Sequence, residues 1–309
     1  MTESPAPEPG YLRLRATGEL AVRARIASER LERCDLCPRR CRVNRRVVPL
    51  RGATCRVGAR AVVHGAFPHF GEERCLSGSA GSGTIFFSGC NLRCDYCQNW
   101  ETSQEGEGRE VAPGELAATM LDLQRQGCHN VNLVSPSHVV AQVLEAVALA
   151  ADQGLRVPLV YNTGGYDASE ALALLDGVVD IYMPDLKYGD DLAGRRYSGV
   201  RNYATVNRAA VREMHRQVGD LRLDNRGLAH RGLLVRHLVL PGEVAGTRKV
   251  LRFVAREVSP STWINLMDQY RPCYHAFDHP EIARRPSREE LCSARAEASR
   301  LGLNRLEAG

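Results

Sequence analysis

Residues 86–100 read FFSGCNLRCDYCQNW and place three cysteines, Cys90, Cys94 and Cys97, within eight positions. The spacing is C-x3-C-x2-C, and no fourth cysteine follows nearby. Tetrahedral metal sites and most iron–sulfur clusters take four protein ligands. The loop therefore predicts a cluster whose fourth iron is left to an exogenous ligand; the alternatives are a zinc site or packing cysteines. A zinc site should add a Cys or His at short spacing, and residues 98–127 contain neither.

The three-cysteine loop follows the first of six short apolar runs that alternate with helical patterns. The runs predict strands at 84–89, 130–135, 158–163, 180–185, 233–240 and 263–270. Strands that alternate with helices predict a parallel sheet with right-handed crossovers. The predicted fold is α/β, an incomplete (β/α)6 TIM-type barrel with an N-terminal Cys-rich module, and a flat doubly wound sheet is the competing architecture.

The chain divides by composition into four predicted parts. The opening MTESPAPEPG is polar and rich in proline, which predicts a disordered tail rather than a signal peptide. The four parts are a polar lead-in (1–28), a Cys-rich metal-binding module (29–80), the barrel (81–280) and a C-terminal helix (281–309). The glycine- and serine-rich stretch 77–83 predicts a turn or hinge between the module and the barrel.

Composition narrows the class of protein. The 309 residues are 44% hydrophobic and 25% charged, as in an ordinary globular protein, and no apolar run approaches the roughly 18 residues of a membrane span. A formal charge of +5 is too small to indicate nucleic-acid binding. Without a secretory signal, the 11 cysteines predict reduced thiols and metal ligands, and hence a cytoplasmic protein.

The three-cysteine loop resembles the signature of the radical S-adenosylmethionine (SAM) superfamily, in which an aromatic residue, here Tyr96, precedes the last cysteine. With DLK (185–187) and VLPG (239–242), the form CNLRCDYCQN is most similar to the pyruvate formate-lyase activating-enzyme-like branch. The resemblance implies that Cys90, Cys94 and Cys97 hold a [4Fe–4S] cluster. It also implies that SAM chelates the open iron, and that one electron cleaves SAM to a 5′-deoxyadenosyl radical that abstracts a hydrogen atom.

The same resemblance assigns residues to SAM strand by strand. In the family, backbone carbonyls after the second strand accept the SAM ammonium, and here that loop contains Ser135 and Pro136 in place of the usual glycines. Asn162 lies at the end of the third strand and is expected near the ribose, with a helix-capping turn as the alternative. On the fifth strand His237 is expected to line the adenosine pocket, with an ordinary core histidine as the alternative.

Asp185 and Lys187 lie two positions apart at the end of the fourth predicted strand, so both side chains should point to one face. The ammonium of Lys187 suits the SAM carboxylate, and Asp185 offers oxygen ligands to a cation or a hydroxyl. The chain has only two lysines, Lys187 and Lys249, against many arginines, which indicates that a guanidinium does not fit at position 187. The alternative is a surface ion pair.

A second cysteine set precedes the barrel, with the spacing C-x2-C-x3-C-x13-C at Cys34, Cys37, Cys41 and Cys55. Four thiols complete a tetrahedral shell, and this segment has too little apolar content to fold on burial alone. The set predicts a second metal site, holding either Zn²⁺ or a second iron–sulfur cluster, with unliganded cysteines as the alternative.

The predicted function is that of a radical SAM enzyme, and the substrate implied by the resemblance is a glycyl residue of a partner enzyme. One alternative is a radical SAM enzyme that modifies a small molecule or a peptide. Another, from a different class, is a non-catalytic iron–sulfur or zinc protein that serves as a scaffold or electron carrier. The expected partners are a one-electron reductant, such as flavodoxin or ferredoxin, and a protein substrate; neither nucleic acid nor a membrane is expected.

Overall fold

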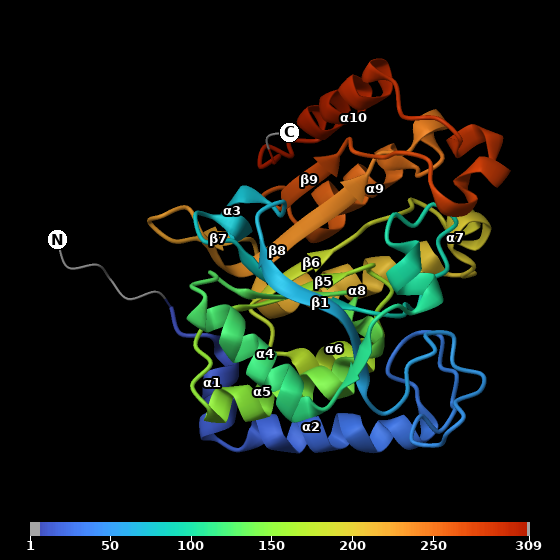
Figure 1. The fold of residues 1–309 in the computed structure, drawn as a ribbon. Helices are drawn as coiled ribbons and strands as arrows, with labels where there is room; N and C mark the ends of the chain where they lie inside the picture. Colours follow the sequence, from blue (N-terminus) through green and yellow to red (C-terminus); the bar gives the residue numbers. More distant parts are fainter. Residues whose placement is uncertain (1–6, 308–309) are drawn as a thin grey trace.

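Six parallel strands carry the fold of residues 7–307, the part of the chain that the computed structural model describes (Figure 1). They are β2 (Ser82–Phe87), β4 (Val131–Val134), β5 (Leu159–Thr163), β6 (Ile181–Pro184), β8 (Ala229–Leu238) and β9 (Trp263–Met267). Each strand pairs in parallel with the next of these along the chain. All six predicted strands are confirmed, although their ends shift by a few residues.

Three further strands extend the sheet in antiparallel directions. They are β1 (Ala61–His69), which pairs with β2, β3 (Arg109–Val111), which pairs with β1, and β7 (Arg222–Leu223), which pairs with β8. The sequence pattern did not predict β1, because Gly65 and Pro68 interrupt its apolar residues and its pairing partner β2 comes after an intervening turn. The sheet order is therefore β3-β1-β2-β4-β5-β6-β8-β7, with β9 paired to β8.

Helices cover the sheet, as the alternation of strands and helices predicts. The helices that connect the strands, and the helix that follows the last strand, are α4 (Pro113–Arg125), α5 (Val140–Asp152), α6 (Ser169–Leu175), α7 (Asp191–Ser198), α8 (Tyr203–Val218), α9 (Thr247–Phe253) and α10 (Arg288–Arg300). The ends of some follow from their sequence. Pro113 opens α4, where Glu115 accepts the backbone N–H of Ala112 at 2.7 Å. Ser287 and Glu290 form a capping box at the start of α10.

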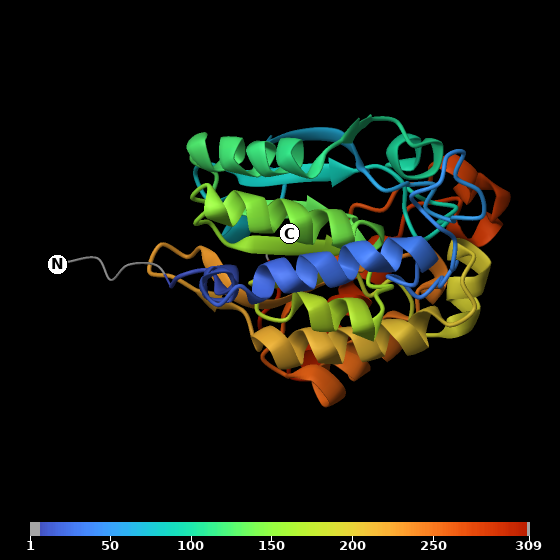
Figure 2. The ribbon, with the colours of Figure 1, turned by 90° about the horizontal axis from the view of Figure 1, so that it is seen from below.

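Most of the lead-in folds onto the outside of the helical layer. Residues 1–6 of the predicted tail lie outside the described residues, and so do residues 308–309. The lead-in forms α1 (Gly10–Ala16) and α2 (Glu19–Glu29), and a short α3 (Arg74–Ser77) follows β1. Helix α2 packs on α5 and α6, and the view from below shows it lying between them (Figure 2).

Burial on both faces of the central strands sets the position of any site. Strands β5 and β6 are buried along their whole length, as is typical of a parallel sheet covered by helices. Ligands of such folds bind at the carboxyl ends of the strands, where the loops after β2, β4, β5 and β6 meet. Among residues 7–307, the helices are all too short or too polar to cross a membrane.

Candidate active site

A cavity of about 820 Å³ opens at the carboxyl ends of the parallel strands. Residues from the loops after β2, β4, β5 and β6 line it, together with residues of β8 and β9. The predicted site residues that line it are Cys90, Cys94, Tyr96, Cys97, Ser135, Asn162, Asp185 and Lys187. The structure therefore brings together most of the residues that the resemblance assigned to the cluster and to SAM.

Each thiol of the three-cysteine loop has a hydrogen-bonding partner beside the cavity. Cys90 Sγ accepts the backbone N–H of Leu92 at 3.3 Å. Cys94 Sγ lies 2.9 Å from Ser198 Oγ, and Cys97 Sγ lies 3.1 Å from Ser103 Oγ. Donors at these positions would hold thiolates in place and stabilise their charge.

Burial makes these thiols weak acids as long as they carry no metal. It raises the pKa of the Cys90 thiol to about 11 and that of the Cys94 thiol to about 12. Iron would have to displace these protons on binding, since the thiolate is the metal ligand.

The placement of the thiols in the three-cysteine loop fits an iron–sulfur cluster better than a single metal ion. In a [4Fe–4S] cluster each thiolate binds a different iron atom, so the sulfurs need to line one cavity rather than meet at one point. Cys90, Cys94 and Cys97 do line one cavity. Within residues 7–307, no three His, Cys, Asp or Glu side chains are placed as ligands of one metal ion.

Lys187 and Asp185 form an ion pair inside the cavity. Lys187 Nζ donates to Asp185 Oδ2 at 2.6 Å, and both side chains are 19% exposed. Burial by itself would lower the pKa of Lys187, but Asp185 and the nearby Cys94 outweigh it and hold that pKa well above its ordinary value. The cavity thus contains a fixed positive charge, as a bound carboxylate would require.

Three other predicted residues meet the cavity from different elements. Ser135 has a left-handed backbone (φ 60°), and its N–H donates to the carbonyl of Asn162 at 2.8 Å, which joins the loop after β4 to the end of β5. Tyr96 is buried and packs edge to face against Tyr188 and Tyr270. These contacts hold the wall of the cavity beside the three-cysteine loop.

Two predicted cofactor residues lie elsewhere. Pro136 is buried and is not among the residues that line the cavity. His237 is fully buried on the opposite face of β8, with its ring nitrogens 2.6 Å from the Leu186 carbonyl and 3.0 Å from Thr247 Oγ1. The structure thus corrects the prediction for His237. Side chains alternate along a strand, and it is Arg236 that points into the cavity.

The end of the cavity near β8 and β9 carries a charged cluster of Glu72, Glu73, Asp185 and Arg236, in which Glu73 is buried and the other three are partly buried. Arg236 Nη1 donates to Glu72 Oε2 at 3.3 Å, and its Nε lies 3.7 Å from Asp185 Oδ1 and 3.8 Å from Glu73 Oε1. These last distances are too long for hydrogen bonds, and Arg236 Nε, Asp185 Oδ1 and Glu73 Oε2 are buried without a partner. Burial raises the pKa of Glu72 to about 7 against the opposing effect of Arg236.

Sequence reasoning missed Glu72 and Glu73, which precede α3 in the segment PHFGEE. Their partner Arg236 is far away in the chain, and the only local signal was a charged residue that interrupts the apolar run of β8.

The second cysteine set, Cys34, Cys37, Cys41 and Cys55, does not reach the large cavity; it surrounds a separate small one.

The fold and this cavity describe an α/β enzyme with a thiol-lined site at the carboxyl ends of its strands, and comparison with known proteins identifies the class. Residues 84–254 match the radical SAM superfamily, and the chain belongs to it. The family uses a [4Fe–4S] cluster and SAM, and its enzymes require a reductant. The residues that line the cavity fit both groups, since they supply three thiols and a lysine.

Two curated relatives are similar to this chain over different lengths. An uncharacterized protein of Methanocaldococcus jannaschii is 32% identical over 295 residues, which are 92% of this chain and 80% of the relative. The pyruvate formate-lyase-activating enzyme of Clostridium pasteurianum is 29% identical over 112 residues, 35% of this chain and 46% of that enzyme.

Two solved structures are also similar. A radical SAM methyltransferase from Sphaerobacter thermophilus has 17% identity and a TM-score of 0.48, over 71% of this chain and 64% of that one. SuiB of Streptococcus suis, solved with its precursor peptide SuiA, has 10% identity and a TM-score of 0.47, over 68% of this chain and 43% of that one.

Proposed function

We propose that this protein cleaves SAM reductively at a cluster held by Cys90, Cys94 and Cys97, and abstracts a hydrogen atom from a substrate in the same cavity. The observation that carries the proposal is that the three thiols and the Asp185–Lys187 pair line one cavity of about 820 Å³. When bound, the reduced cluster supplies the electron that splits SAM into methionine and the 5′-deoxyadenosyl radical. The chain itself binds, orients and encloses the reactants.

The residues around the thiols divide this work. Lys187, held by Asp185 at 2.6 Å, would bind the SAM carboxylate. Ser135 and Asn162, joined through their backbones, would contact the amino group and the ribose of SAM. The aromatic wall of Tyr96, Tyr188 and Tyr270 would keep water from the thiols. Pro136 has no direct part in this proposal, because it lies outside the cavity lining.

The architecture proposed for this chemistry is an incomplete (β/α)6 barrel over residues 81–280. It is supported by six parallel strands that pair in chain order, β2-β4-β5-β6-β8-β9, because in a barrel each strand pairs with its neighbour along the chain. The flanking parts proposed with it are the lead-in (1–28), the Cys-rich module (29–80) and the C-terminal region (281–309), which contains α10. We also propose a cytoplasmic location and a flavodoxin or ferredoxin as the reductant.

For the substrate we carry two proposals. The first is a glycyl residue of a partner enzyme, which is supported by the similarity over 112 residues to a pyruvate formate-lyase-activating enzyme. The second is a small molecule or peptide with a charged group. It is supported by the unpartnered atoms of Asp185, Glu73 and Arg236, since a glycyl residue has no side chain that could pair with them.

The test is formation of 5′-deoxyadenosine by protein reconstituted anaerobically with iron and sulfide and then given SAM and dithionite. We expect release from the wild type and none from Cys94→Ala. Cys292→Ser, which changes an exposed cysteine that does not line the cavity, should behave as the wild type. If the wild type binds iron normally but releases no 5′-deoxyadenosine, even when cell extract supplies substrates, the protein is an iron–sulfur carrier and the proposal is wrong.

A separate measurement distinguishes the two substrates. Incubation with SAM, reductant and cell extract should give the electron paramagnetic resonance signal of a glycyl radical on a second protein if the first proposal is right. If 5′-deoxyadenosine forms without that signal, and Arg236→Met lowers its substrate-dependent formation, the charged substrate is supported instead. Arg231→Met, on the same strand but outside the cavity, is the matched control.

A further inference from the structure

Residues 34–60 run from the end of a short helical turn at Arg33 to the start of β1 without a helix or strand. The buried side chains in this segment are those of Leu36, Arg45, Val57 and three of the four cysteines. A segment of this length with so little apolar burial needs another source of order. Cysteines that bind a metal are one such source, because binding supplies free energy that the segment's own core cannot.

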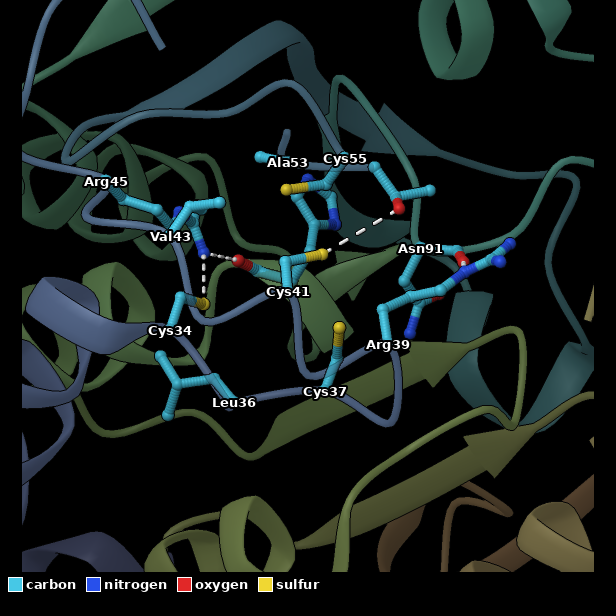
Figure 3. A pocket seen from close by; sticks show the side chains of 12 residues that line it. Cys34, Leu36, Cys37, Arg39, Cys41, Val43, Arg45, Ala53, Cys55 and Asn91 are labelled. Carbon is cyan, nitrogen blue, oxygen red and sulfur yellow. Dashed lines mark hydrogen bonds between the residues drawn. The ribbon is translucent and has the colours of Figure 1, made fainter. Parts of the chain in front are cut away.

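The four cysteines of the second set lie around one small cavity. Cys34, Cys37, Cys41 and Cys55 line a cavity of about 10 Å³, and Figure 3 shows their sulfurs spread around it. Cys34, Cys37 and Cys55 are buried and Cys41 is partly exposed. Apart from the thiols, the lining consists of apolar, threonine, asparagine, histidine and arginine side chains, with no carboxylate.

The backbone brings the thiols together at some conformational cost. Arg40, Arg42 and Arg56 have positive φ angles of 42°, 55° and 60°, which residues other than glycine seldom adopt. The first two flank Cys41 and the third follows Cys55. Two backbone hydrogen bonds, Cys34 N–H to Val43 O at 2.9 Å and Arg42 N–H to Cys34 O at 2.8 Å, close this loop on itself.

A buried cation lines the same small cavity as the four thiols and lacks an anion. Arg45 is 2% exposed; its Nε donates to Val57 O and its Nη1 to His138 O, both at 2.7 Å. Nη1 also lies 3.7 Å from Cys34 Sγ, while Nη2 is buried and has no partner. Arg39, which lines the same cavity, has a buried Nη2 without a partner as well.

A buried guanidinium is costly unless a negative charge compensates it, and four neutral thiols supply none. Four thiolates around Zn²⁺, or around a [4Fe–4S]²⁺ core, would carry a net charge of −2 where Arg45 and Arg39 meet the thiols. Either centre would therefore supply the negative charge that the buried guanidinium of Arg45 requires.

We propose that Cys34, Cys37, Cys41 and Cys55 ligate a metal centre of net negative charge, either a zinc ion or an iron–sulfur cluster, with Arg45 as its buried counter-ion. As placed, no three of these thiols meet at one ion, so binding draws them inward by rotation of their side chains. This centre is separate from the one at Cys90, Cys94 and Cys97 and does not depend on the reaction proposed above.

The proposed centre touches the loop that carries Cys90. A β-carbon on Gly89 would lie 2.4 Å from the carbonyl oxygen of Cys55, so the two backbones are in direct contact. Arg39 Nε donates to the carbonyl of Asn91 at 2.7 Å. Asn91 lines both cavities. Metal binding at the second set would therefore fix both residues that flank Cys90.

The test measures metal in protein whose first set is removed. Cys90, Cys94 and Cys97 are changed to alanine together, and the protein is purified and reconstituted anaerobically. We expect about one zinc ion or about four irons with matching sulfide per chain to remain. Adding Cys37→Ser should remove that metal, whereas adding Cys292→Ser should leave it unchanged. Zinc or iron that is lost with Cys37→Ser supports the proposal; no metal in the triple variant overturns it.

A second measurement keeps the test valid if Cys37→Ser fails to fold. Wild-type protein is treated with an alkylating reagent before and after a chelator, and the modified cysteines are located by peptide mapping. Cys34, Cys37, Cys41 and Cys55 should become reactive together as metal is released, while Cys128, buried elsewhere, stays protected. If the chelator releases metal without changing the reactivity of these four thiols, the proposal is wrong.

Discussion

The two cysteine sets of this protein lie against each other but are built in opposite ways. Cys90, Cys94 and Cys97 follow β2, a strand in the interior of the sheet, and face a cavity of about 820 Å³. Cys34, Cys37, Cys41 and Cys55 belong to a segment without helix or strand and surround about 10 Å³. The first set has three thiols beside room for a ligand, and the second has four thiols and almost no room.

This difference in structure predicts that the first cysteine set serves the reaction and that the second serves the stability of the fold. The first loop follows an interior strand of the sheet, so losing a thiol there should affect reaction more than stability. The second segment has little core of its own, so losing a thiol there should affect stability more than reaction. Gly89 and Asn91 connect the two sets, and a change at that contact should affect both.

The largest expected effect tests this separation directly. We expect Cys37→Ser to lower the free energy of unfolding of metal-loaded protein by about 3 kcal/mol or more, because a proposed metal centre loses one of four ligands. Cys94→Ser should lower it by only about 1 kcal/mol while abolishing 5′-deoxyadenosine release. Chemical denaturation measures the first quantity and product analysis the second. Equal stability losses in the two variants would contradict the comparison.

The next effect concerns the contact between the sets. Gly89 has a φ of 78°, and a β-carbon there would meet the Cys55 carbonyl at 2.4 Å and Val57 Cγ2 at 2.9 Å. Gly89→Ala should therefore cost about 2–4 kcal/mol of stability, and it should lower the metal content of both sets. Gly114→Ala is the control, because that glycine lies in the first turn of α4 with open space around it. Loss of metal from one set alone would show that the contact does not couple them.

A smaller effect concerns the binding of SAM, for which only the cavity of the first cysteine set has room. Lys187→Arg should raise the KM for SAM about tenfold, which is about 1.4 kcal/mol, because a planar guanidinium does not reproduce the compact ammonium held by Asp185. Lys249→Arg is the matched control, since Lys249 is exposed and pairs with Asp190 on the surface. The kinetics of 5′-deoxyadenosine formation at varied SAM concentration give the KM of each variant. An unchanged KM for Lys187→Arg would show that Lys187 does not bind SAM.

The two sets also differ in what the sequence could predict. The strands and the three-cysteine loop were predictable because their signals are local: apolar periodicity for the strands, and close spacing for Cys90, Cys94 and Cys97. Strand β1 was not, since Gly65 and Pro68 interrupt its pattern and β2 supplies its pairing. Local patterns describe how a segment can fold but not which distant segment it meets.

The charged cluster shows this limit most clearly. Glu72 and Arg236 are 164 positions apart, and only the folded sheet brings them together. Arg236 and His237 are neighbours on β8, and because side chains alternate along a strand only one of the two can face the cavity. The register of β8 against β6 and β9 decides it, so that Arg236 enters the cavity while His237 bonds Leu186 and Thr247 outside it.

The smallest expected effect comes from Glu72, a titrating group in the first set's cavity. Burial raises its pKa to about 7 in the folded protein, above its ordinary value near 4.5, despite the opposing charge of Arg236. Between these pH values the folded state holds a proton that the unfolded state has released, so the free energy of unfolding falls as pH rises. Glu72→Gln, which cannot ionise, should lack this decline.

We therefore expect the variant to gain on the order of 1 kcal/mol over the wild type between pH 5 and pH 8, with little further change above that. Denaturation of metal-free protein across this range measures the difference, and Glu110→Gln, at an exposed carboxylate on β3, should follow the wild type. Parallel curves for Glu72→Gln and wild type would mean that Glu72 is ionised throughout. The cavity would then hold three carboxylates, those of Glu72, Glu73 and Asp185, against the two cations Arg236 and Lys187, and this excess of negative charge would favour a cationic group on the substrate.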